Sequence, residues 1–376
     1  MSSRTMKPAS PKVIVFAGCG IGDLILGTPL FASIHKSLPG ARITVVLRSD
    51  LPREILKGNP DVQKILHYPD KCSLYLFPRF PKVHKKVFKF LEYLIIELAF
   101  IFRIKSHRFD ISMHLLPGGI ADAHALITWL CGAKIRVGPQ LLSRSGMSKW
   151  CYTHAISWDN YRHVVENNLD NLRALGFNDF DVHLKLFIHE NDQRKADAIL
   201  DESGIRERES ILGMHTGGGD SAKPFWPVER FVGVARHLVE SRKCRVIVFF
   251  GPQELREITA FKDIPVIPIV NMPFGVVCGF INRCSLFISS DTGLGHAAAA
   301  LMVPTLTLFG NGNERKHRHW GNRNFAINKL PESRVTGVET AYLAGAEGKE
   351  ALQKISVEEV ITRADELLEE CKGQRR

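Results

Sequence analysis

The sequence predicts an α/β protein built from two parallel β-sheets covered by helices, and three observations support this prediction. The chain has 376 residues, more than the ~250 to 300 residues at which single hydrophobic cores stop growing. Strand-like apolar runs alternate with helical stretches, a pattern typical of parallel sheets. A strand followed by a glycine-rich loop and a helix opens each half of the chain. We therefore expect two domains of similar architecture.

The N-terminal half begins with a strand, a loop, a helix and a second strand. The apolar run PKVIVFA precedes the loop GCGIGD (residues 18–23), a helical stretch continues to about Leu38, and ARITVVLR follows. Binding sites of such sheets lie at the carboxyl ends of the strands. The loop after Ala17 is therefore a candidate functional site.

The C-terminal half repeats this arrangement. We expect strands at residues 210–216, 244–252, 286–291 and 305–310, with helices between them. The same rule makes the loops after Thr216, Ser290 and Phe309 candidate sites.

The domain boundary is expected in the polar passage 178–204, which carries one short strand and one helix, and we place it near Leu186. Near the end of the chain, Ser356 and Glu359 form a capping box before an apolar stripe, which predicts a terminal amphipathic helix. The predicted parts are residues 1–186, 187–355 and 356–376.

Composition excludes several classes of protein. With 45% hydrophobic and 24% charged residues, the chain is not disordered, collagenous or a coiled coil in its main architecture. The eight cysteines include no CxxC pair, which argues against a zinc cluster and a disulfide scaffold. The polar N-terminal segment lacks the apolar core of a signal peptide. We expect a cytoplasmic protein.

The net charge of +11 favours an anionic partner. Residues 71–108 hold nine Lys or Arg against two Glu, a local surplus of +7. Their apolar run, residues 90–102, is shorter than the ~20 residues that span a bilayer. We interpret the stretch as a surface facing a membrane and an acceptor, or alternatively as a buried helix with a solvated basic edge. The lysines of this surface are Lys82, Lys85, Lys86 and Lys89.

Asp23 stands where the dinucleotide-binding motif G-x-G-x-x-G requires its third glycine. A carboxylate there would repel a pyrophosphate, which disfavours a nicotinamide-dependent dehydrogenase. The helix dipole would instead keep the carboxylate ionised. Asp23 is therefore a candidate general base, and the alternative is that it only caps the helix.

The second glycine-rich loop, HTGGGDSAKPFWP (residues 215–227), combines backbone N–H groups with Lys223. Glycines let the backbone approach phosphate oxygens, and a lysine adds a mobile positive charge. The loop suits a diphosphate, although a glycine-rich turn with a solvated lysine fits equally well. It does not match the P-loop pattern.

Residues 289–310, SSDTGLGHAAAALMVPTLTLFG, form the most specific pattern. Thr292 and Gly293 lie between a strand end and a helix start, so that their N–H groups would face an anion, and His296 lies in the first turn. The basic run Arg315–His319 is interpreted as a solvated loop, because like charges repel, and we assign it no metal. No pattern indicates a nucleic-acid partner.

These residues give the chain a resemblance to glycosyltransferase family 9, the bacterial ADP-heptose:lipopolysaccharide heptosyltransferases. The resemblance covers nearly the whole chain and rests on residues 20–46, 108–115, 221–231, 249–254 and 289–310. It implies the GT-B architecture, in which two Rossmann-like domains face a cleft. The N-terminal domain would bind the acceptor and the C-terminal domain the nucleotide sugar.

The resemblance also implies roles for individual residues. Asp23 would be the catalytic base and Lys223 the lysine that meets the donor phosphates. The other donor-binding residues it implies are Thr216, Gly217, Glu254 (ribose), Met272 (adenine), Asp291, Thr292, Gly293 and His296. The chain departs from the family in having two residues, Pro224 and Phe225, between Lys223 and the following tryptophan, and in lacking Pro-Thr-Asp-Pro after Gly310.

The implied function is inverting, metal-independent transfer of heptose from ADP-heptose to a lipopolysaccharide-core acceptor. A peripheral position on the inner face of the bacterial inner membrane would suit such an acceptor. A base is needed on one face of the sugar and charge neutralisation on the other. The resemblance implies that charge neutralisation by lysine and helix ends replaces a divalent metal, and we expect no metal and no cofactor. The alternatives are a GT-B transferase or epimerase using another nucleotide sugar, and a non-catalytic protein that binds nucleotide sugars.

Overall fold

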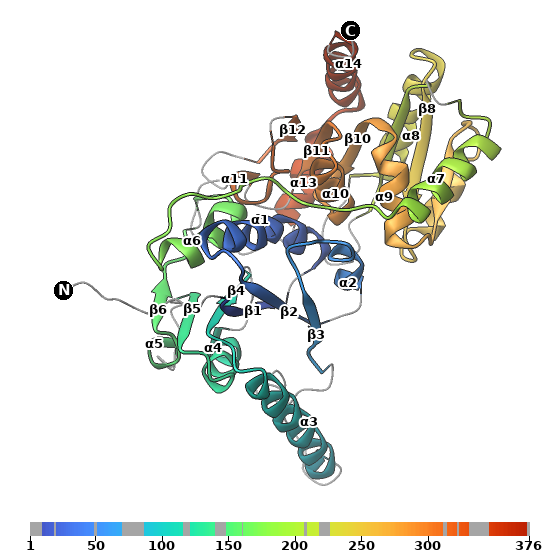
Figure 1. The fold of residues 1–376 in the computed structure, drawn as a ribbon. Coiled ribbons are helices and arrows are strands. Elements are labelled where there is room, and N and C mark those ends of the chain that lie inside the picture. The colour runs from blue at the N-terminus through green and yellow to red at the C-terminus, as the bar shows by residue number, and fades with distance from the viewer. Residues whose placement is uncertain are drawn as a thin grey trace. The chain divides into compact units, whose positions relative to one another are not determined.

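The computed structural model divides the chain into two compact units (Figure 1). The N-terminal unit comprises Met1–Asp159 and Val164–Val182, and the C-terminal unit comprises Asn160–His163 and His183–Arg376. Both are α/β units with a parallel sheet, as the sequence predicts. The residues described are 10–18, 20–48, 51–69, 86–115, 121–139, 148–159, 161–206, 209–217, 226–310, 314–321, 323–330 and 346–373.

The N-terminal unit has a six-stranded sheet in the order β3-β2-β1-β4-β5-β6, with every neighbouring pair parallel. Chain order therefore reverses between β1 and β4, and ligands of open α/β sheets commonly bind at the carboxyl ends of strands at such a reversal. The strands are β1 (Lys12–Ala17), β2 (Arg42–Leu47), β3 (Lys64–His67), β4 (Ile111–His114), β5 (Ile135–Pro139) and β6 (His154–Ile156).

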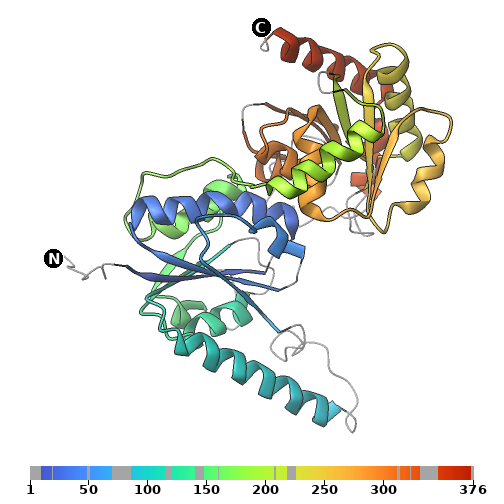
Figure 2. The ribbon, with the colours of Figure 1, turned by 45° about the vertical axis from the view of Figure 1, so that its right-hand side comes forward.

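Helices cover both faces of this sheet (Figure 2). They are α1 (Ile21–Ser37), α2 (Leu51–Ile55), α3 (Lys86–Ser106), α4 (Ala121–Leu130), α5 (Ser148–Cys151) and α6 (Val164–Arg173). Helices α1 and α6 pack together, and α3 packs with α4. Phe100 and Ile104, one turn apart on α3, are buried with Phe16 of β1 and Ile127 of α4. This apolar stripe fixes α3 to the sheet.

The C-terminal unit has the same topology, because its order β12-β11-β10-β7-β8-β9 again places the fourth strand beside the first. All neighbouring strands are parallel. The strands are β7 (Ile211–His215), β8 (Arg245–Phe250), β9 (Ile267–Val270), β10 (Cys284–Ser290), β11 (Thr305–Phe309) and β12 (Asn324–Asn328).

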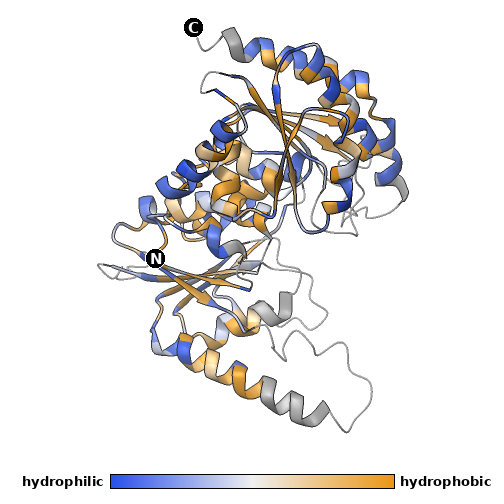
Figure 3. Cartoon of the chain, turned by 90° about the vertical axis from the view of Figure 1, so that its right-hand side faces the viewer, coloured by the Kyte–Doolittle hydropathy of each residue, from blue (hydrophilic) through white to orange (hydrophobic). Residues whose placement is uncertain are grey.

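The helices at residues 228–240 and 357–373 turn apolar faces to the sheet and polar faces outward (Figure 3), whereas those at residues 274–282 and 293–300 are buried along most of their length. The helices of this unit are α7 (Glu190–Glu202), α8 (Val228–Glu240), the 3-10 helix η1 (Leu255–Phe261), α9 (Phe274–Asn282), α10 (Gly293–Ala300), α11 (Glu314–His317), α13 (Ala346–Lys354) and α14 (Val357–Gly373). Helix α14 begins after Ser356, whose Oγ accepts a hydrogen bond from the Glu359 N–H at 3.1 Å. It packs on α8, and Asp365 of α14 meets Arg242 at 2.7 Å.

One predicted element is wrong. Residues 177–189 alternate apolar and polar side chains, yet they form no strand in the described structure. Alternation produces a strand only where a sheet edge accepts the backbone hydrogen bonds, and neither six-stranded sheet includes this segment. It connects α6 to α7 instead.

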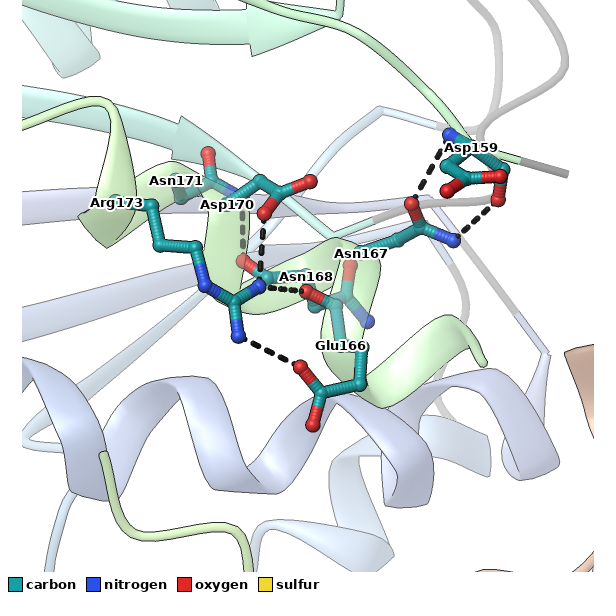
Figure 4. A network of polar contacts seen from close by, with 7 residues as sticks. All are labelled: Asp159, Glu166, Asn167, Asn168, Asp170, Asn171 and Arg173. Carbon is teal, nitrogen blue, oxygen red and sulfur yellow. Dashed lines mark hydrogen bonds and ion pairs between the residues drawn. The ribbon is translucent and has the colours of Figure 1, made fainter. Parts of the chain in front are cut away.

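A polar network holds the chain where it leaves and re-enters the N-terminal unit (Figure 4). The Asn167 side chain donates to the Asp159 carbonyl at 2.8 Å and accepts from the Asp159 N–H at 3.1 Å. Arg173 pairs with Glu166 at 2.6 Å and with Asp170 at 2.8 Å. Between Asp159 and α6, residues 161–163 belong to the C-terminal unit. The His163 ring there lies 4.5 Å from that of Trp320.

Candidate functional site

Four segments that are distant in sequence meet at one edge of the C-terminal sheet. The strands β10, β7, β8 and β9 are consecutive neighbours and run parallel. Their carboxyl ends are followed by Thr292, Thr216, Glu254 and Met272, respectively. The edge thus brings together, in spatial order, four of the residues that the resemblance implies for donor binding.

The start of α10 has the geometry of an anion site. Thr292 is the N-cap residue, with an extended backbone and a side-chain oxygen that accepts from the Gly295 N–H at 3.3 Å. No acidic residue lies in the first turn. The first N–H groups of a helix lack intrahelical partners, and the dipole makes this end positive. A ligand phosphate would therefore be favoured here.

His215, the last residue of β7, supports this turn. Its Nδ1 lies 3.2 Å from the Thr292 Oγ1. Burial lowers the pKa of His215 to about 4, so the ring is neutral near pH 7. It holds the N-cap side chain without adding charge to the edge.

Asp291 and His296 lie beside the same turn, with the Asp291 Oδ1 3.5 Å from the His296 Nε2. The ring of His319 lies 4.8 Å from that of His296. His319 is buried, and its Nδ1 contacts the hydroxyls of Thr307 at 2.8 Å and Thr305 at 2.9 Å. The interpretation of Arg315–His319 as a solvated loop is therefore wrong at His319. Two threonines of β11 bind its ring, and no local pattern indicates that contact.

Glu254 lies against the first described glycines that follow β7 and β8, Gly217 and Gly251. One carboxylate oxygen, Oε2, accepts a hydrogen bond from the Gly251 N–H at 2.9 Å. A Cβ added at Gly217 would lie 2.4 Å from the other oxygen, Oε1. Gly217 is thus required for the close approach of Glu254.

Glu257 is a residue that the sequence reasoning missed. Burial raises the pKa of this carboxyl, the Thr216 hydroxyl opposes the shift, and the charge of Glu254 adds to it. Two carboxyl groups therefore lie near Thr216 and Gly217, and burial makes Glu257 easier to protonate than an ordinary glutamate. Only the contact across the sheet edge identifies it.

Met272 is 38% exposed in the turn between β9 and α9. Lys223 lies outside the described residues, which resume at Trp226. The Trp226 side chain is buried, and its Nε1 donates to the Ile355 carbonyl at 3.1 Å. The end of the lysine-containing loop is thereby fixed to the body of the unit.

In the N-terminal unit, Asp23 is the third residue of α1 and is partly buried. The N-cap residue is Gly20, which makes no side-chain capping bond. Asp23 is therefore not the N-cap, contrary to the alternative considered from sequence. The dipole of α1 stabilises its ionised form at this position.

Lys82 and Lys85 lie outside the described residues, and Lys86 and Lys89 belong to the first turn of α3, whose side chains are not described there. Further along α3, Ile95 is 65% and Phe102 71% exposed. The helix therefore carries an uncovered apolar face beside its buried one. Within the described part of the chain, no helix is long and apolar enough to span a bilayer.

The chain matches a family model over residues 98–341, described as glycosyltransferase family 9 (heptosyltransferase). It is 23% identical over 313 residues to lipopolysaccharide heptosyltransferase 3 of Escherichia coli, covering 80% of this chain and 84% of that protein.

Solved structures share the fold over nearly the full length. A glycosyltransferase family 9 protein of Veillonella parvula superposes with a TM-score of 0.76 at 22% identity, covering 96% of this chain and 98% of that one. A heptosyltransferase of Escherichia coli solved with ADP gives a TM-score of 0.67 at 16% identity, covering 95% and 99%. At these identities the superpositions establish the shared two-unit α/β fold, the GT-B fold of heptosyltransferases.

Proposed function

We propose, because the chain belongs to glycosyltransferase family 9, that this glycosyltransferase moves a heptose from ADP-heptose to a hydroxyl of a lipopolysaccharide core. The names of the similar proteins support the donor and acceptor classes. One is a lipopolysaccharide heptosyltransferase, and the structure of another contains ADP.

The observation that carries the proposal is the order of side chains along the C-terminal sheet edge. From β10 to β9 there are three strand spacings, or ~14 Å, which suits an extended nucleoside diphosphate. The bare N-terminus of α10 would meet the diphosphate, Glu254 the ribose, and the exposed Met272 the adenine. The positive end of the α10 dipole near β10 suits the diphosphate of ADP, and the apolar side chain of Met272 near β9 suits the adenine.

The proposed transfer inverts the configuration at the anomeric carbon of the sugar. The acceptor hydroxyl attacks as the bond to the diphosphate breaks, and Asp23 takes the hydroxyl proton as general base. Lys223 and the first amides of α10, at Thr292 and Gly293, neutralise the charge that develops on the leaving ADP. These groups supply both halves of the reaction, so the chemical step is proposed to need no metal ion.

The acceptor side is proposed to involve a membrane surface on the cytoplasmic side. The exposed apolar face of α3 and the lysines Lys82, Lys85, Lys86 and Lys89 would meet acyl chains and anionic headgroups, respectively. Apolar insertion and attraction of lysines to anionic lipid are the two terms that hold peripheral proteins on bilayers.

A panel of nucleoside diphosphates tests the donor assignment by thermal shift. A ligand that binds only the folded state adds ~2.7 kcal/mol of stability at 100 times its dissociation constant. ADP should raise Tm more than UDP or GDP at equal concentration, and ADP-heptose should be turned over in the presence of a core acceptor. A larger shift with UDP would favour a transferase or epimerase using another donor. Binding of ADP-heptose without turnover would favour a non-catalytic protein.

A further inference from the structure

Three side chains that can ligate a metal ion gather beside the start of α10. They are Asp291, which follows β10, His296, in the first turn of α10, and His319, which follows α11. One ligand atom of each lies within 4.8 Å of the others. The sequence places His319 more than twenty residues from the other two and shows no metal-ligand spacing. Only the fold creates the cluster.

His319 is held as a ligating imidazole is held. Its Nδ1 contacts the hydroxyls of Thr305 and Thr307 at 2.9 and 2.8 Å. Such contacts fix the ring and leave the opposite nitrogen to bind an ion. A neutral imidazole held in this way is the form that binds a metal ion.

Two ring nitrogens in the cluster lack partners. The His319 Nε2 and the His296 Nδ1 are buried and make no hydrogen bond within the described part of the chain. Both side chains are at least nine-tenths buried. Buried polar atoms are nearly always paired, so each unpaired one calls for an explanation. An ion shared with Asp291 would lie on the Nε2 side of His296, which is 3.5 Å from the Asp291 Oδ1. The unpaired His319 Nε2 is therefore the atom whose pairing such an ion would explain.

A glycine keeps space beside these atoms. A Cβ added at Gly295 would lie 2.5 Å from the His319 Nε2 and 2.8 Å from the Ser289 Oγ. The Ser289 Oγ is also buried without a partner in the residues described. Any side chain at position 295 would fill the region into which the His319 Nε2 points.

We propose that Asp291, His296 and His319 bind one divalent transition-metal ion, and that Zn²⁺ fits the site best. Two neutral imidazoles and one carboxylate suit Zn²⁺ and related ions, whereas Mg²⁺ and Ca²⁺ prefer oxygen ligands. Zinc bonds of ~2.1 Å in a tetrahedron bring ligand atoms to ~3.4 Å from one another. The cluster must contract to reach this spacing, and Asp291 is its least buried member.

The ion would join the segment 314–321 to the first turn of α10. It would leave at least one coordination position for water or another oxygen ligand. This inference goes beyond the proposed function, because no step of the transfer passes through the ion.

Direct zinc binding tests the proposal without nucleotide or acceptor. The full chain is stripped with a chelator, dialysed and titrated with Zn²⁺ against a chromophoric competitor. We expect one tight equivalent for the parent. Since loss even of an outer partner of a ligand costs 10- to 100-fold in affinity, Asp291→Asn should weaken this equivalent by at least ~10-fold. His319→Gln should abolish it.

His237→Gln is the matched control, because His237 also pairs with an aspartate, Asp365, at 3.1 Å, elsewhere in the same unit. This variant should bind zinc as the parent does. Asp291→Asn keeps the test decisive if His319→Gln fails to fold. Absence of a tight equivalent in the parent, or equal affinity in Asp291→Asn, would overturn the proposal. A parent that binds ADP but no zinc would refute the ion site and leave the proposed function standing.

Discussion

Helices α1 and α10 both start at the carboxyl ends of strands, in two sheets with the same strand order. They differ in whether an acidic residue lies in the first turn. Helix α1 carries its own carboxylate, Asp23, in the first turn. Helix α10 has no acid in its first turn and is capped by the neutral side chain of Thr292. A helix N-terminus favours one negative charge. The first turn of α1 holds that charge itself, whereas the first turn of α10 holds none, and Asp291 before its N-cap is 3.5 Å from His296.

This difference in charge suits the two helix starts to different functions, although the two sheets have the same topology. A carboxylate that stays ionised can accept a proton, whereas an empty helix N-terminus can bind a phosphate. Removing the carboxylate charge from α1 tests this difference most directly.

Asp23→Asn should lower kcat by ~10² to 10⁴, because the amide cannot act as a general base. Donor affinity should stay within a few-fold of the parent, since the proposed donor residues all belong to the C-terminal unit. Steady-state kinetics and ADP titration measure the two quantities separately. Near-normal turnover would return Asp23 to a structural role at the end of α1.

Acid should weaken the C-terminal unit through its buried histidines. Burial lowers the pKa of His163 to about 3 and that of His215 to about 4. The unfolded chain, with ordinary histidine pKa values near ~6.5, therefore binds more protons than the folded chain between about pH 6.5 and 4. Stability conferred by the neutral rings is present above pH 6.5 and is lost as pH falls, on the order of 2 kcal/mol per histidine by pH 5.

Hydrogen exchange at pH 7 and pH 5, corrected for intrinsic rates, measures this loss. Amides of β7 and β10 report the C-terminal unit, and those of β1 give the reference for the N-terminal unit. His163→Gln should flatten the dependence. Protection of β7 that does not change with pH would contradict the assignment of neutral buried rings.

Gly293→Asp would give α10 the same kind of charge that α1 carries. Gly293 does not have a positive φ, so an L-residue fits its backbone. The new carboxylate should stabilise the helix slightly, while donor affinity falls by about tenfold through repulsion of the diphosphate. Gly293→Asn is the uncharged control. If both variants weaken ADP binding equally, side-chain size rather than charge is responsible.

The smallest effect is expected from the lysines of the N-terminal unit, which would meet anions through mobile side chains. Replacing Lys82, Lys85, Lys86 and Lys89 with glutamine should reduce sedimentation with anionic vesicles by a few-fold at low salt. Apolar insertion should persist, and high salt should erase the difference, because surface charges are screened beyond ~8 to 10 Å. Equal binding by parent and variant at low salt, with unchanged acceptor KM, would exclude these lysines from the membrane surface.

Features set by local pattern could be predicted from the sequence. Thr216 and Asp-Thr-Gly each follow an apolar run, and this pattern predicts a strand that ends in a loop. The capping box at Ser356 predicts the start of α14. Features made by distant contacts could not. His319 is positioned by two threonines of β11, and Glu257 becomes notable only beside Glu254 and Thr216. The alternating run before α7 resembles a strand, but the lack of a neighbouring edge leaves it unpaired.

The segment 161–163 has a consequence for synthesis of the protein on the ribosome. The His163 Nε2 bonds to the Arg318 carbonyl, 155 residues further along the chain. At ~5 to 20 residues per second, this partner emerges roughly 8 to 30 s after His163 itself. Helix α6, which follows directly, finds Asp159 and β4 already made. During translation His163 must therefore wait for its partner, although all of the N-terminal unit, Met1–Asp159 and Val164–Val182, has been synthesised long before Arg318 emerges.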